Sequence, residues 1–591
     1  MEPRLLNRVA RVLIATAIVL GASAHAEALS FHDPGEPAQA AARIADAMTD
    51  QELLGQVFFL GWQGVGPSAD LLRWISSRAI GGIKIFPRNV ADLPSLARDI
   101  ERMQRLSARS RFGIPLFVAT DQEGGWVRQI KDETSVSPGN LALGASGVPA
   151  DAYRTGWYLG RELAVLGINM DFAPTADVYS NPEASVIGPR SFGSDPSSTG
   201  LLSAAYARGM ADAGVLCAAK HFPGHGSADQ DSHGHLPKID ASLDQLLGRD
   251  LIPYRILVRE GIPAIMTGHL AFPRITGDLT PASLSAFFLK DVLRKELGFK
   301  GLVITDDMEM EGVLADGMDT AEACRTALEA GNDMILISHT PATQEHTWGE
   351  LAAAMKGRPG FRAIVKEAVL RILETKIRAF RDETRPAVAA AVTADPSASP
   401  PAAVSDPPPA APARLAVAAT RLPIPAPGAR DFFAQVSARA VTQVTGARIP
   451  YRPAPRERIL LVGQFAEFIS EGLRRYPGAS TLLFPFAPFY SSRPEDHAAV
   501  RSAAAGADTV IFCLANFNSL DVLQELKGQA DRVIVISALS PVYLSDVPWV
   551  RTAIAVYGDG RDSFRAGFAV LAGDYRATGV LPVNFGRAAG Q

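Results

Sequence analysis

Between about residues 40 and 380, short apolar runs alternate with longer amphipathic segments, and this alternation constrains the fold more than any other feature. Amphipathic segments such as Ala152–Leu166 and Leu201–Ala213 have the spacing of helices. Eight strand–helix units predict an α/β fold of the (β/α)8 TIM-barrel type, with a doubly wound open sheet as the alternative that periodicity alone leaves open. The eight apolar runs, each with the length of a buried strand, are Val57–Leu60, Gly82–Phe86, Pro115–Thr120, Asn169–Ala173, Leu216–His221, Ala264–His269, Leu302–Asp307 and Met334–Ser338.

Polar residues stand at the ends of five of these runs. In a parallel α/β barrel, the active site forms at the carboxyl ends of the strands. The pattern therefore predicts a catalytic face made by residues from several strands. The residues concerned are Asp121 after the third run, Asp171 and Asp177 at the fourth, Lys220 and His221 at the fifth, His269 at the sixth, and Asp306 and Asp307 at the seventh.

The chain changes character after the barrel. Its 591 residues exceed what one hydrophobic core holds. We expect the barrel domain at residues 30–384 and a semi-rigid linker, rich in Pro and Ala, at 385–428. Residues 429–591 again alternate apolar and helical segments, which predicts a smaller α/β domain with a mainly parallel sheet. Its expected strands are Ile459–Val462, Thr509–Leu514, Val533–Ser537 and Thr552–Val556, with helices at Phe465–Arg475 and Asp521–Gly528.

The first residues have the pattern of an export signal. Arg4, Arg8 and Arg11 precede an apolar run, Val12–Leu20, and a small-x-small cleavage site follows at residues 24–26. We therefore expect a signal peptide at residues 1–26 and a periplasmic or extracellular protein. Since the run is too short to cross a bilayer comfortably, an uncleaved anchor is the less favoured alternative.

Charge and cysteine content narrow the function classes. A net charge of −4 with no basic stripe argues against a nucleic-acid or anionic-membrane partner. Cys217, Cys324 and Cys513 are far apart in sequence and are expected as small buried side chains rather than a disulfide framework.

The segment from Lys220 to His235 holds four of the ten histidines of the chain. Asp231 and His233 are separated by one residue, and a carboxylate beside an imidazole stabilises its protonated form, which suits proton transfer near neutral pH. Two alternatives stay open: a polar loop that only caps the barrel, and a metal site built from His221, His225, His233 and His235. The histidine spacing matches no common zinc pattern.

Two adjacent aspartates end the seventh apolar run. Because side chains alternate along a strand, only one of Asp306 and Asp307 can point into the barrel mouth. The other is expected to be structural, for example by capping the next helix. The inward carboxylate could act as a nucleophile in glycosyl transfer or as a metal ligand.

The segments at these strand ends resemble glycoside hydrolase family 3, in its β-N-acetylglucosaminidase (β-N-acetylhexosaminidase) branch. The resemblance covers roughly residues 40–380, and the second domain more weakly resembles the αβα sandwich of the same family. The segments that carry it are Lys220-His-Phe-Pro-Gly-His-Gly followed by Asp231-Ser-His233, Asp121-Gln-Glu-Gly-Gly, Gly167-Ile-Asn-Met-Asp-Phe-Ala-Pro, Ile187-Gly-Pro-Arg190-Ser-Phe-Gly and Ile304-Thr-Asp306-Asp-Met, and in the second domain Ser540–Tyr543, Ala555–Gly558 and Thr578–Val583.

The resemblance implies a role for each matching residue. Asp306 corresponds to the nucleophile, His233 to the acid/base and Asp231 to its partner. The residues that correspond to those holding the sugar hydroxyls, with fold maintenance as the alternative role, are Asp121, Arg190, Lys220 and His221. His225 and His235 are expected to shape the loop, and the second domain to serve as a scaffold or in dimer formation.

One motif departs from the family pattern. The family usually continues Asp-x-Glu-Gly-Gly with Arg-Val-x-Arg, whereas this chain continues with Trp126-Val-Arg128-Gln129. No sugar-contacting arginine is therefore assigned in this segment.

Taken together, these features predict an exported, retaining exo-β-N-acetylglucosaminidase that needs no metal or other cofactor. Its expected substrates are peptidoglycan or chitin fragments with terminal N-acetylglucosamine, and its expected state is a monomer or homodimer without stable membrane insertion. The alternatives are a family member with another sugar specificity or phosphorolytic activity, a catalytically silent carbohydrate-binding protein, and a metal-dependent hydrolase using the histidine-rich loop.

Overall fold

A computed structural model describes residues 29–131, 133–228, 234–314, 317–381, 423–486 and 492–584. The expected signal segment and most of the expected linker lie outside these ranges. In the described part of the chain, no helix is both long and apolar enough to cross a membrane.

The first part of the chain forms a closed barrel of eight parallel strands in the order β1-β10-β9-β8-β7-β6-β3-β2. Each predicted apolar run contains one of these strands, so the barrel is confirmed and the open sheet is wrong. The strands are β1 (Phe58–Leu60), β2 (Gly82–Lys84), β3 (Phe117–Thr120), β6 (Met170–Asp171), β7 (Leu216–Phe222), β8 (Ala264–Thr267), β9 (Leu302–Asp307) and β10 (Met334–Ile337).

Apart from the polar residues at their carboxyl ends, the strands are mostly apolar because both of their faces are covered. All residues of β3, β8 and β10 are buried, as expected for a parallel sheet with side chains inside and helices outside. Inside the barrel, the rings of Phe59 and Phe172 lie 5.3 Å apart. The facing position on β2 is Gly82, where a Cβ atom would lie only 2.7 Å from the ring of Phe59.

The helices of the barrel domain begin where short polar side chains can bond free backbone N–H groups. Asp92, Asp195 and Asp319 accept such bonds at the starts of the helices that follow them. The main barrel helices are α2 (Pro37–Ala47), α3 (Asp50–Gln56), α4 (Ala69–Arg78), α5 (Leu93–Ser107), α6 (Asn140–Ser146), α7 (Pro149–Val165), α8 (Pro196–Asp212), α10 (Leu251–Arg259), η5 (Phe287–Glu296), α12 (Thr320–Ala330), α13 (Pro341–Gly357) and α14 (Phe361–Phe380).

The second domain is a six-stranded sheet in the order β11-β16-β15-β14-β12-β13, in which only β11 runs antiparallel to its neighbour. All four predicted strands are present, but β11 and β13 were not predicted, and the helix predicted at Asp521–Gly528 instead starts at Phe517. Its elements are α16 (Ala429–Ala440), β11 (Thr442–Gly446), β12 (Ile459–Gly463), α17 (Ala466–Arg475), β13 (Ser480–Leu483), α18 (Pro494–Ala505), β14 (Thr509–Leu514), α19 (Phe517–Gln524), β15 (Val533–Ser537), β16 (Thr552–Ala555) and α20 (Arg561–Ala572).

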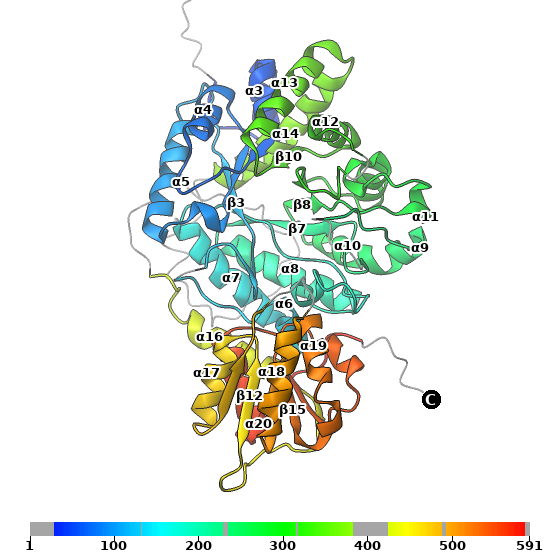
Figure 1. Ribbon diagram of the computed structural model, residues 1–591. Coiled ribbons are helices and arrows are strands. Elements are labelled where there is room, and N and C mark those ends of the chain that lie inside the picture. Colours follow the sequence, from blue (N-terminus) through cyan, green and yellow to red (C-terminus); the bar gives the residue numbers. More distant parts are fainter. Residues whose placement is uncertain are drawn as a thin grey trace, which may run out of the picture.

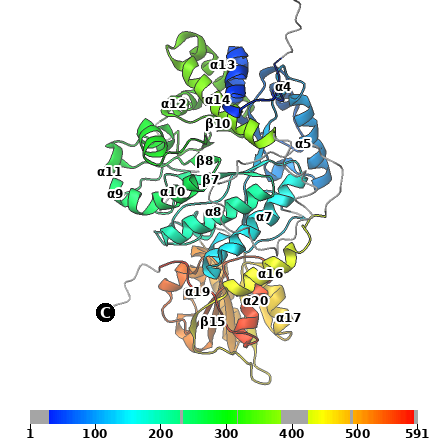
Figure 2. The same ribbon diagram turned by 180° about the vertical axis from the view of Figure 1, so that it is seen from behind.

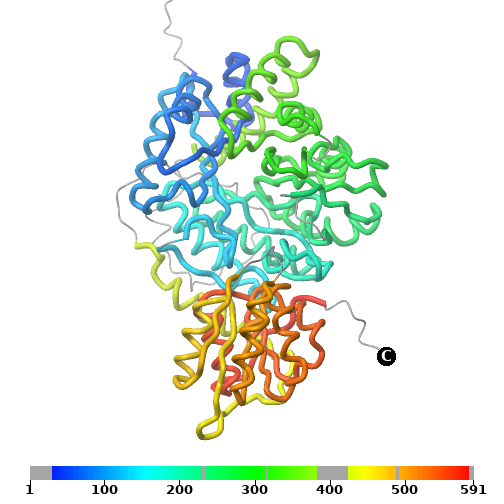
Figure 3. The backbone as a smooth tube through the Cα atoms, in the orientation of Figure 1, coloured from blue at the N-terminus to red at the C-terminus, as the bar shows by residue number. Residues whose placement is uncertain are grey.

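The second domain lies against α6, α7 and α8 of the barrel domain (Figures 1 and 2), and the backbone trace shows α16 at the junction (Figure 3). Phe432 and Phe433 of α16 belong to the same apolar core as the barrel. Arg439 of α16 makes a bidentate ion pair with Asp151 of α7, with N···O distances of 2.7 and 2.9 Å. The junction is therefore a packed contact with both apolar and charged parts.

Candidate active site

The strand register brings two of the predicted site residues, His221 and Asp306, to the same end of the barrel. Phe222 of β7 pairs with Thr267 of β8, which pairs with Thr305 of β9. His221 and Asp306 are the neighbours of the outer two residues, so they flank β8 at the same end of the barrel. Between them, Gly268 leaves room: a Cβ atom there would lie 3.1 Å from that of His221.

Asp121 is held between two lysines. Its carboxylate accepts a hydrogen bond from Lys220 at 2.6 Å and lies 3.0 Å from Lys84, which ends β2. Burial by itself would raise the pKa of Asp121, but the two lysine charges outweigh burial and hold the pKa well below its ordinary value. Asp121 is therefore ionised at neutral pH.

Glu123 is a second carboxylate that is paired with Lys220. Arg190 donates to both of its carboxylate oxygens, at 2.7 and 2.9 Å, and Lys220 lies 2.7 Å from one of them. Despite full burial, which opposes ionisation, these cations lower the pKa of Glu123 to about 2. Lys220 thus bridges Asp121 and Glu123, and its own pKa is raised because their charges outweigh its burial.

His221 is fixed at both ring nitrogens. Arg190 lies 3.3 Å from Nε2, and since a guanidinium can only donate, Nε2 accepts and the ring proton is on Nδ1. Nδ1 donates to Asp177 at 2.7 Å, and Asp177 also accepts the backbone N–H of His221 and of His225. Burial, together with the neighbouring His221, lowers the pKa of the His225 ring to about 4.

These seven residues form one connected set, which we call the charge network: Lys84, Asp121, Lys220, Glu123, Arg190, His221 and Asp177. Its three cations, Lys84, Lys220 and Arg190, are paired with Asp121 and Glu123, and Asp177 is paired with His221. Side-chain exposure is 11% for Asp121 and for Arg190, but 1% for Glu123 and 0% for Asp177. The first two can reach a ligand in the mouth, whereas the last two support them from below.

The predicted residues Asp121, Arg190, Lys220 and His221 are brought together in this network. Glu123 and Lys84 were not predicted to take part. The signal for Lys84 was a single charged residue inside the apolar run Gly82–Phe86, and the signal for Glu123 was its position in the same motif as Asp121.

The two aspartates of β9 differ in their surroundings. Asp307 is buried, lies 3.2 Å from the Nε2 atom of His339, and accepts the N–H of Glu309 in the turn after the strand. Asp307 is thus the less accessible of the two aspartates, and the helix-capping role proposed for it is wrong, because Asp319 caps the next helix, α12. Asp306 is partly exposed and lies near His269. Burial lowers the pKa of His269, although the negative charge of Asp306 acts in the opposite direction.

Asp171 lies beneath the charge network at the end of β6. It is fully buried and accepts the backbone N–H of Gln122, the residue between Asp121 and Glu123, at 2.8 Å. Burial raises the pKa of Asp171 to about 7, because its single strong hydrogen bond and the more distant Lys220 only partly compensate. Asp171 thus anchors the backbone that carries both acids.

Asp231 and His233, the predicted proton-transfer pair, lie outside the described residues. His235 is exposed, and His225 is buried beside His221 with the ring centroids 5.7 Å apart. Within the part of the chain that the structure describes, no group of three or more His, Cys, Asp or Glu residues is arranged to hold a metal ion.

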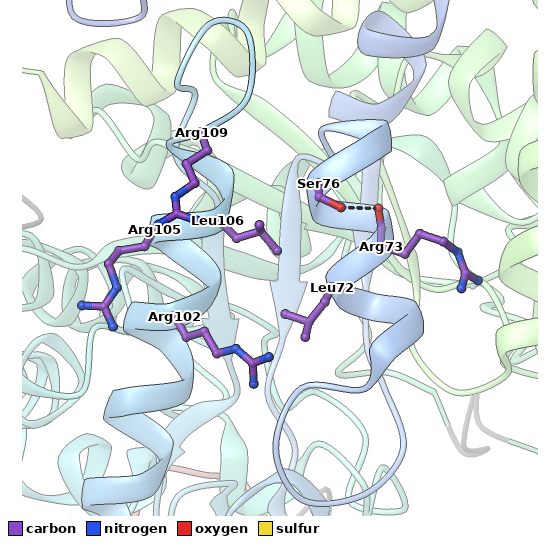
Figure 4. Close-up of a pocket in the computed structure, with 7 residues that line it drawn as sticks. All are labelled: Leu72, Arg73, Ser76, Arg102, Arg105, Leu106 and Arg109. Atoms are coloured by element: carbon purple, nitrogen blue, oxygen red, sulfur yellow. Dashed lines mark hydrogen bonds between the residues drawn. The ribbon is translucent and has the colours of Figure 1, made fainter.

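A separate hollow of about 410 Å³ lies between α4 and α5 on the outside of the barrel. It is lined by Leu72, Arg73, Ser76, Arg102, Arg105, Leu106 and Arg109. Figure 4 shows Arg73 and Arg105 pointing away from each other, so their charges do not converge on one ligand position. The strand-end network, and not this hollow, is the candidate active site.

Parts of the chain are similar to known proteins. Residues 51–375 match the N-terminal domain of glycosyl hydrolase family 3. The β-hexosaminidase of Neisseria gonorrhoeae is 38% identical over 273 residues, which cover 44% of this chain and 72% of that enzyme. β-Hexosaminidase A of Pseudoalteromonas piscicida is 34% identical over 321 residues, which are 49% of this chain and only 54% of that relative.

The likeness to solved structures extends to both domains. A family 3 β-N-acetylglucosaminidase from a Paenibacillus species superimposes with a TM-score of 0.78 and 28% identity, covering 91% of this chain and 99% of that structure. A fungal multi-domain β-N-acetylglucosaminidase of the same family gives the same TM-score with 26% identity, covering 91% of this chain and 61% of that structure. The chain therefore belongs to glycosyl hydrolase family 3, as a glycoside hydrolase of the β-hexosaminidase type.

Proposed function

We propose that the protein is a retaining exo-β-N-acetylglucosaminidase that removes terminal N-acetylglucosamine from peptidoglycan or chitin fragments. The observation that carries the proposal is the charge network at the barrel mouth, with Asp306 at the end of β9, on the other side of β8 from Lys220 and His221. The network offers fixed donors and acceptors for sugar hydroxyls, and Asp306 offers a partly exposed carboxylate.

The proposed reaction has two steps. In the first, a carboxylate oxygen of Asp306 attacks the anomeric carbon, the glycosidic C–O bond breaks, and protonated His233 gives its proton to the leaving oxygen. In the second, a water molecule attacks the same carbon, passes a proton to His233, and the bond to Asp306 breaks. Asp231 would hold the imidazole in place and stabilise its charged form. The roles of Asp231 and His233 rest on the sequence motif.

The nucleophile is tested by Asp306→Asn, which removes the charge but keeps the shape. Hydrolysis of 4-nitrophenyl N-acetyl-β-glucosaminide should fall by a factor of about 1,000 or more, because the covalent step is lost. With the unmodified chain, a slow 5-fluoro N-acetyl-β-glucosaminide should leave a sugar adduct on the peptide containing Asp306, detectable by mass spectrometry. As a control, Asp240→Asn changes a carboxylate whose side chain is 85% exposed and should leave the rate unchanged. Retained activity in Asp306→Asn would refute the assignment.

The acid/base role is tested by the leaving-group dependence of His233→Ala. An activated aryl leaving group departs without a proton, so the variant should lose much more rate on N,N′-diacetylchitobiose than on the aryl substrate. His235→Ala, in the same loop at an exposed position, is the matched control. An equal loss on both substrates would argue against general acid catalysis by His233.

Two additions to the assay separate the alternatives. Chelation by EDTA should leave the rate unchanged, whereas a metal-dependent hydrolase would lose activity and regain it on addition of metal. Added phosphate should not change the product, and the appearance of a sugar 1-phosphate would instead indicate phosphorolysis. Binding of N-acetylglucosamine without turnover of any glycoside in a chromogenic panel would indicate a catalytically silent protein.

The natural substrate and the location are tested separately. Initial rates on defined muropeptides and on N,N′-diacetylchitobiose compare peptidoglycan with chitin fragments. Because Arg4, Arg8 and Arg11 precede an apolar run and a small-x-small site, we also propose export. N-terminal sequencing of the mature protein, expected to begin near residue 27, and cell fractionation test this part.

A further inference from the structure

The segment that departs from the family pattern, Trp126-Val-Arg128-Gln129, forms the outer part of a small hairpin. Its strands are β4 (Gln122–Gly124) and β5 (Val127–Arg128), in which Gln122 pairs with Arg128. On the inner side, Asp121 and Glu123 hold Lys84, Lys220 and Arg190 of the charge network. Whatever fixes the outer part of this hairpin thus also fixes the two acids.

The outer part of the hairpin contacts the second domain. Trp126 packs against the apolar cluster that contains Phe468, Ile536 and Phe564, all residues of the second domain. Arg128 is partly buried and interacts electrostatically with Asp559 of the second domain: burial lowers the pKa of Arg128 and raises that of Asp559, and the charge of each opposes the shift of the other. The packing of the Trp126 ring therefore joins the hairpin to the second domain, and the opposite charges of Arg128 and Asp559 attract across the same contact.

The Arg190 segment of the charge network has a link of the same kind. Asn140, the first residue of α6, donates its side-chain amide to the carbonyl of Arg190 at 2.7 Å. The next residues of α6, Leu141 and Ala142, belong to an apolar cluster made mostly of second-domain residues. The backbone of Arg190 is thus held by a helix that packs on the second domain.

The Asp177 segment is linked in the same way. Asp177 holds His221, and two residues later Tyr179 joins the same second-domain cluster. The hydroxyl of Tyr179 lies 3.3 Å from that of Ser540 in the second domain. Three separate barrel segments thus carry network residues on one side and contact the second domain on the other.

We propose that the second domain holds the sugar-binding residues of the barrel in position, and that Trp126 is the principal positioning residue of this contact. The inference rests on the proposed function, since it assigns the charge network to sugar binding. It also gives a physical reason for the departure from the family motif: the residue after Glu123-Gly-Gly is an aromatic ring because it is seated in a second domain.

The test compares Trp126→Ala with Trp126→Phe. Because the network binds the sugar in both the ground and the transition state, misplacing it should raise KM while changing kcat much less. We expect Trp126→Ala to raise the KM for 4-nitrophenyl N-acetyl-β-glucosaminide and the calorimetric Kd for N-acetylglucosamine by about tenfold, with kcat within about threefold. Trp126→Phe, which keeps an aromatic ring, should stay within about threefold of the unmodified chain in all three constants.

The matched control is Arg439→Gln, which removes the two-pronged ion pair with Asp151 elsewhere in the same domain contact. It should lower the melting temperature but leave KM and Kd unchanged. An unchanged Kd in folded Trp126→Ala would overturn the proposal. An equal loss of binding in Arg439→Gln would do so too, because it would show a general loosening of the two domains.

A measurement without ligand separates this proposal from the proposed function. Amide hydrogen exchange should be faster over residues 121–128 in Trp126→Ala, and unchanged there in Arg439→Gln. If the unmodified chain binds no N-acetylglucosamine, the proposed function fails, and the exchange data alone decide whether the second domain positions the hairpin. Equal exchange over residues 121–128 in both variants would refute it. If Trp126→Ala does not fold, Arg128→Gln and Asp559→Asn take its place in the same measurements.

Discussion

Lys220 is the residue on which the charge network depends most. It is almost completely buried and lies within 2.7 Å of both Asp121 and Glu123. A buried cation between two buried anions costs solvation, and it is maintained because each partner would otherwise be an uncompensated charge. The low exposure of Lys220, 3% for its side chain, indicates that it orders the two acids.

Replacement of Lys220 by Met should therefore lower both stability and activity. We expect a loss of about 3 kcal/mol in the free energy of unfolding, because Lys84 and Arg190 keep part of the compensation. We also expect a fall in kcat/KM of about 100-fold or more. Urea unfolding and steady-state kinetics measure the two effects. Lys300→Met, at an exposed position, should change neither.

Asp171 predicts a distinct dependence of stability on pH. Its pKa of about 7 lies above the ordinary value of 3.8. Between these two pH values, Asp171 is therefore protonated in the folded protein but ionised in the unfolded chain. The contribution of Asp171 to stability is thus fully present below about pH 4 and is lost as pH rises through 7. It corresponds to roughly 4 kcal/mol.

Asp171→Asn should remove this pH dependence, since an amide does not titrate and its oxygen can still accept the N–H of Gln122. Relative to the unmodified chain, the variant should gain stability between pH 4 and pH 8, as measured by urea unfolding at several pH values. Asp240→Asn is the exposed control. Parallel stability curves for Asp171→Asn and the unmodified chain would contradict the raised pKa.

At the scale of elements, the strands that carry the site could be predicted because buried strands are marked in the sequence by short apolar runs. All eight barrel strands coincide with apolar runs, whereas β13 was missed because Ser480–Leu483 is largely exposed and has no such run. The true start of α19 was marked by Asn516, whose side chain caps the helix, but the apolar pattern alone placed it later. Lys84 stands inside a short apolar run, so the sequence alone could not assign it to the site; its contact with the site depends on the closed barrel.

What the sequence could not supply was contact across elements. The pairing of Glu123 with Arg190 joins residues 67 positions apart, and that of His221 with Asp177 joins residues 44 apart. Neither spacing carries a periodic signal. The link from Trp126 to the second domain was equally hidden, although the departure from the family pattern marked the residue as unusual.

Tyr206 of α8 shows how a barrel helix fixes the site hairpin. Its hydroxyl is fully buried and donates to the backbone carbonyl of Gln122 in β4 at 3.0 Å. Tyr206→Phe would leave that carbonyl without its donor, which should cost about 1–2 kcal/mol of stability and raise KM, because the hairpin carries Asp121 and Glu123. Tyr153→Phe removes a partly solvent-exposed tyrosine hydroxyl bond to Asp212 and should cost less than about 0.5 kcal/mol. Equal losses in the two variants, measured by thermal unfolding, would contradict this role.

For the whole molecule, the two domains share cores as well as a boundary. The ring centroids of Phe432 in α16 and Tyr158 of the barrel lie 5.2 Å apart, and the guanidinium carbon of Arg154 lies 4.4 Å from the centroid of the Phe432 ring. Because α16 precedes the second sheet directly, loss of packing at this helix should be felt on both sides of the junction.

Phe432→Ala should therefore destabilise the whole chain by about 3–5 kcal/mol, the usual cost of removing a buried ring. Differential scanning calorimetry should show the melting of both domains moving down together. Leu201→Ala, at a position that is 57% exposed, should leave the melting profile in place. A shift confined to one of two separate transitions would show that the domains are energetically independent.

The shared helix also has a consequence for how the protein is made. The last barrel helix ends at Phe380, but residues of α16, near position 430, complete the same apolar core. During synthesis, the barrel sequence therefore leaves the ribosome well before the barrel can finish packing. The surface around Tyr158 lacks the α16 side chains that cover it until about 50 further residues have been made. Nascent chains stalled before α16 emerges should be readily cut by protease, and those stalled after it should resist.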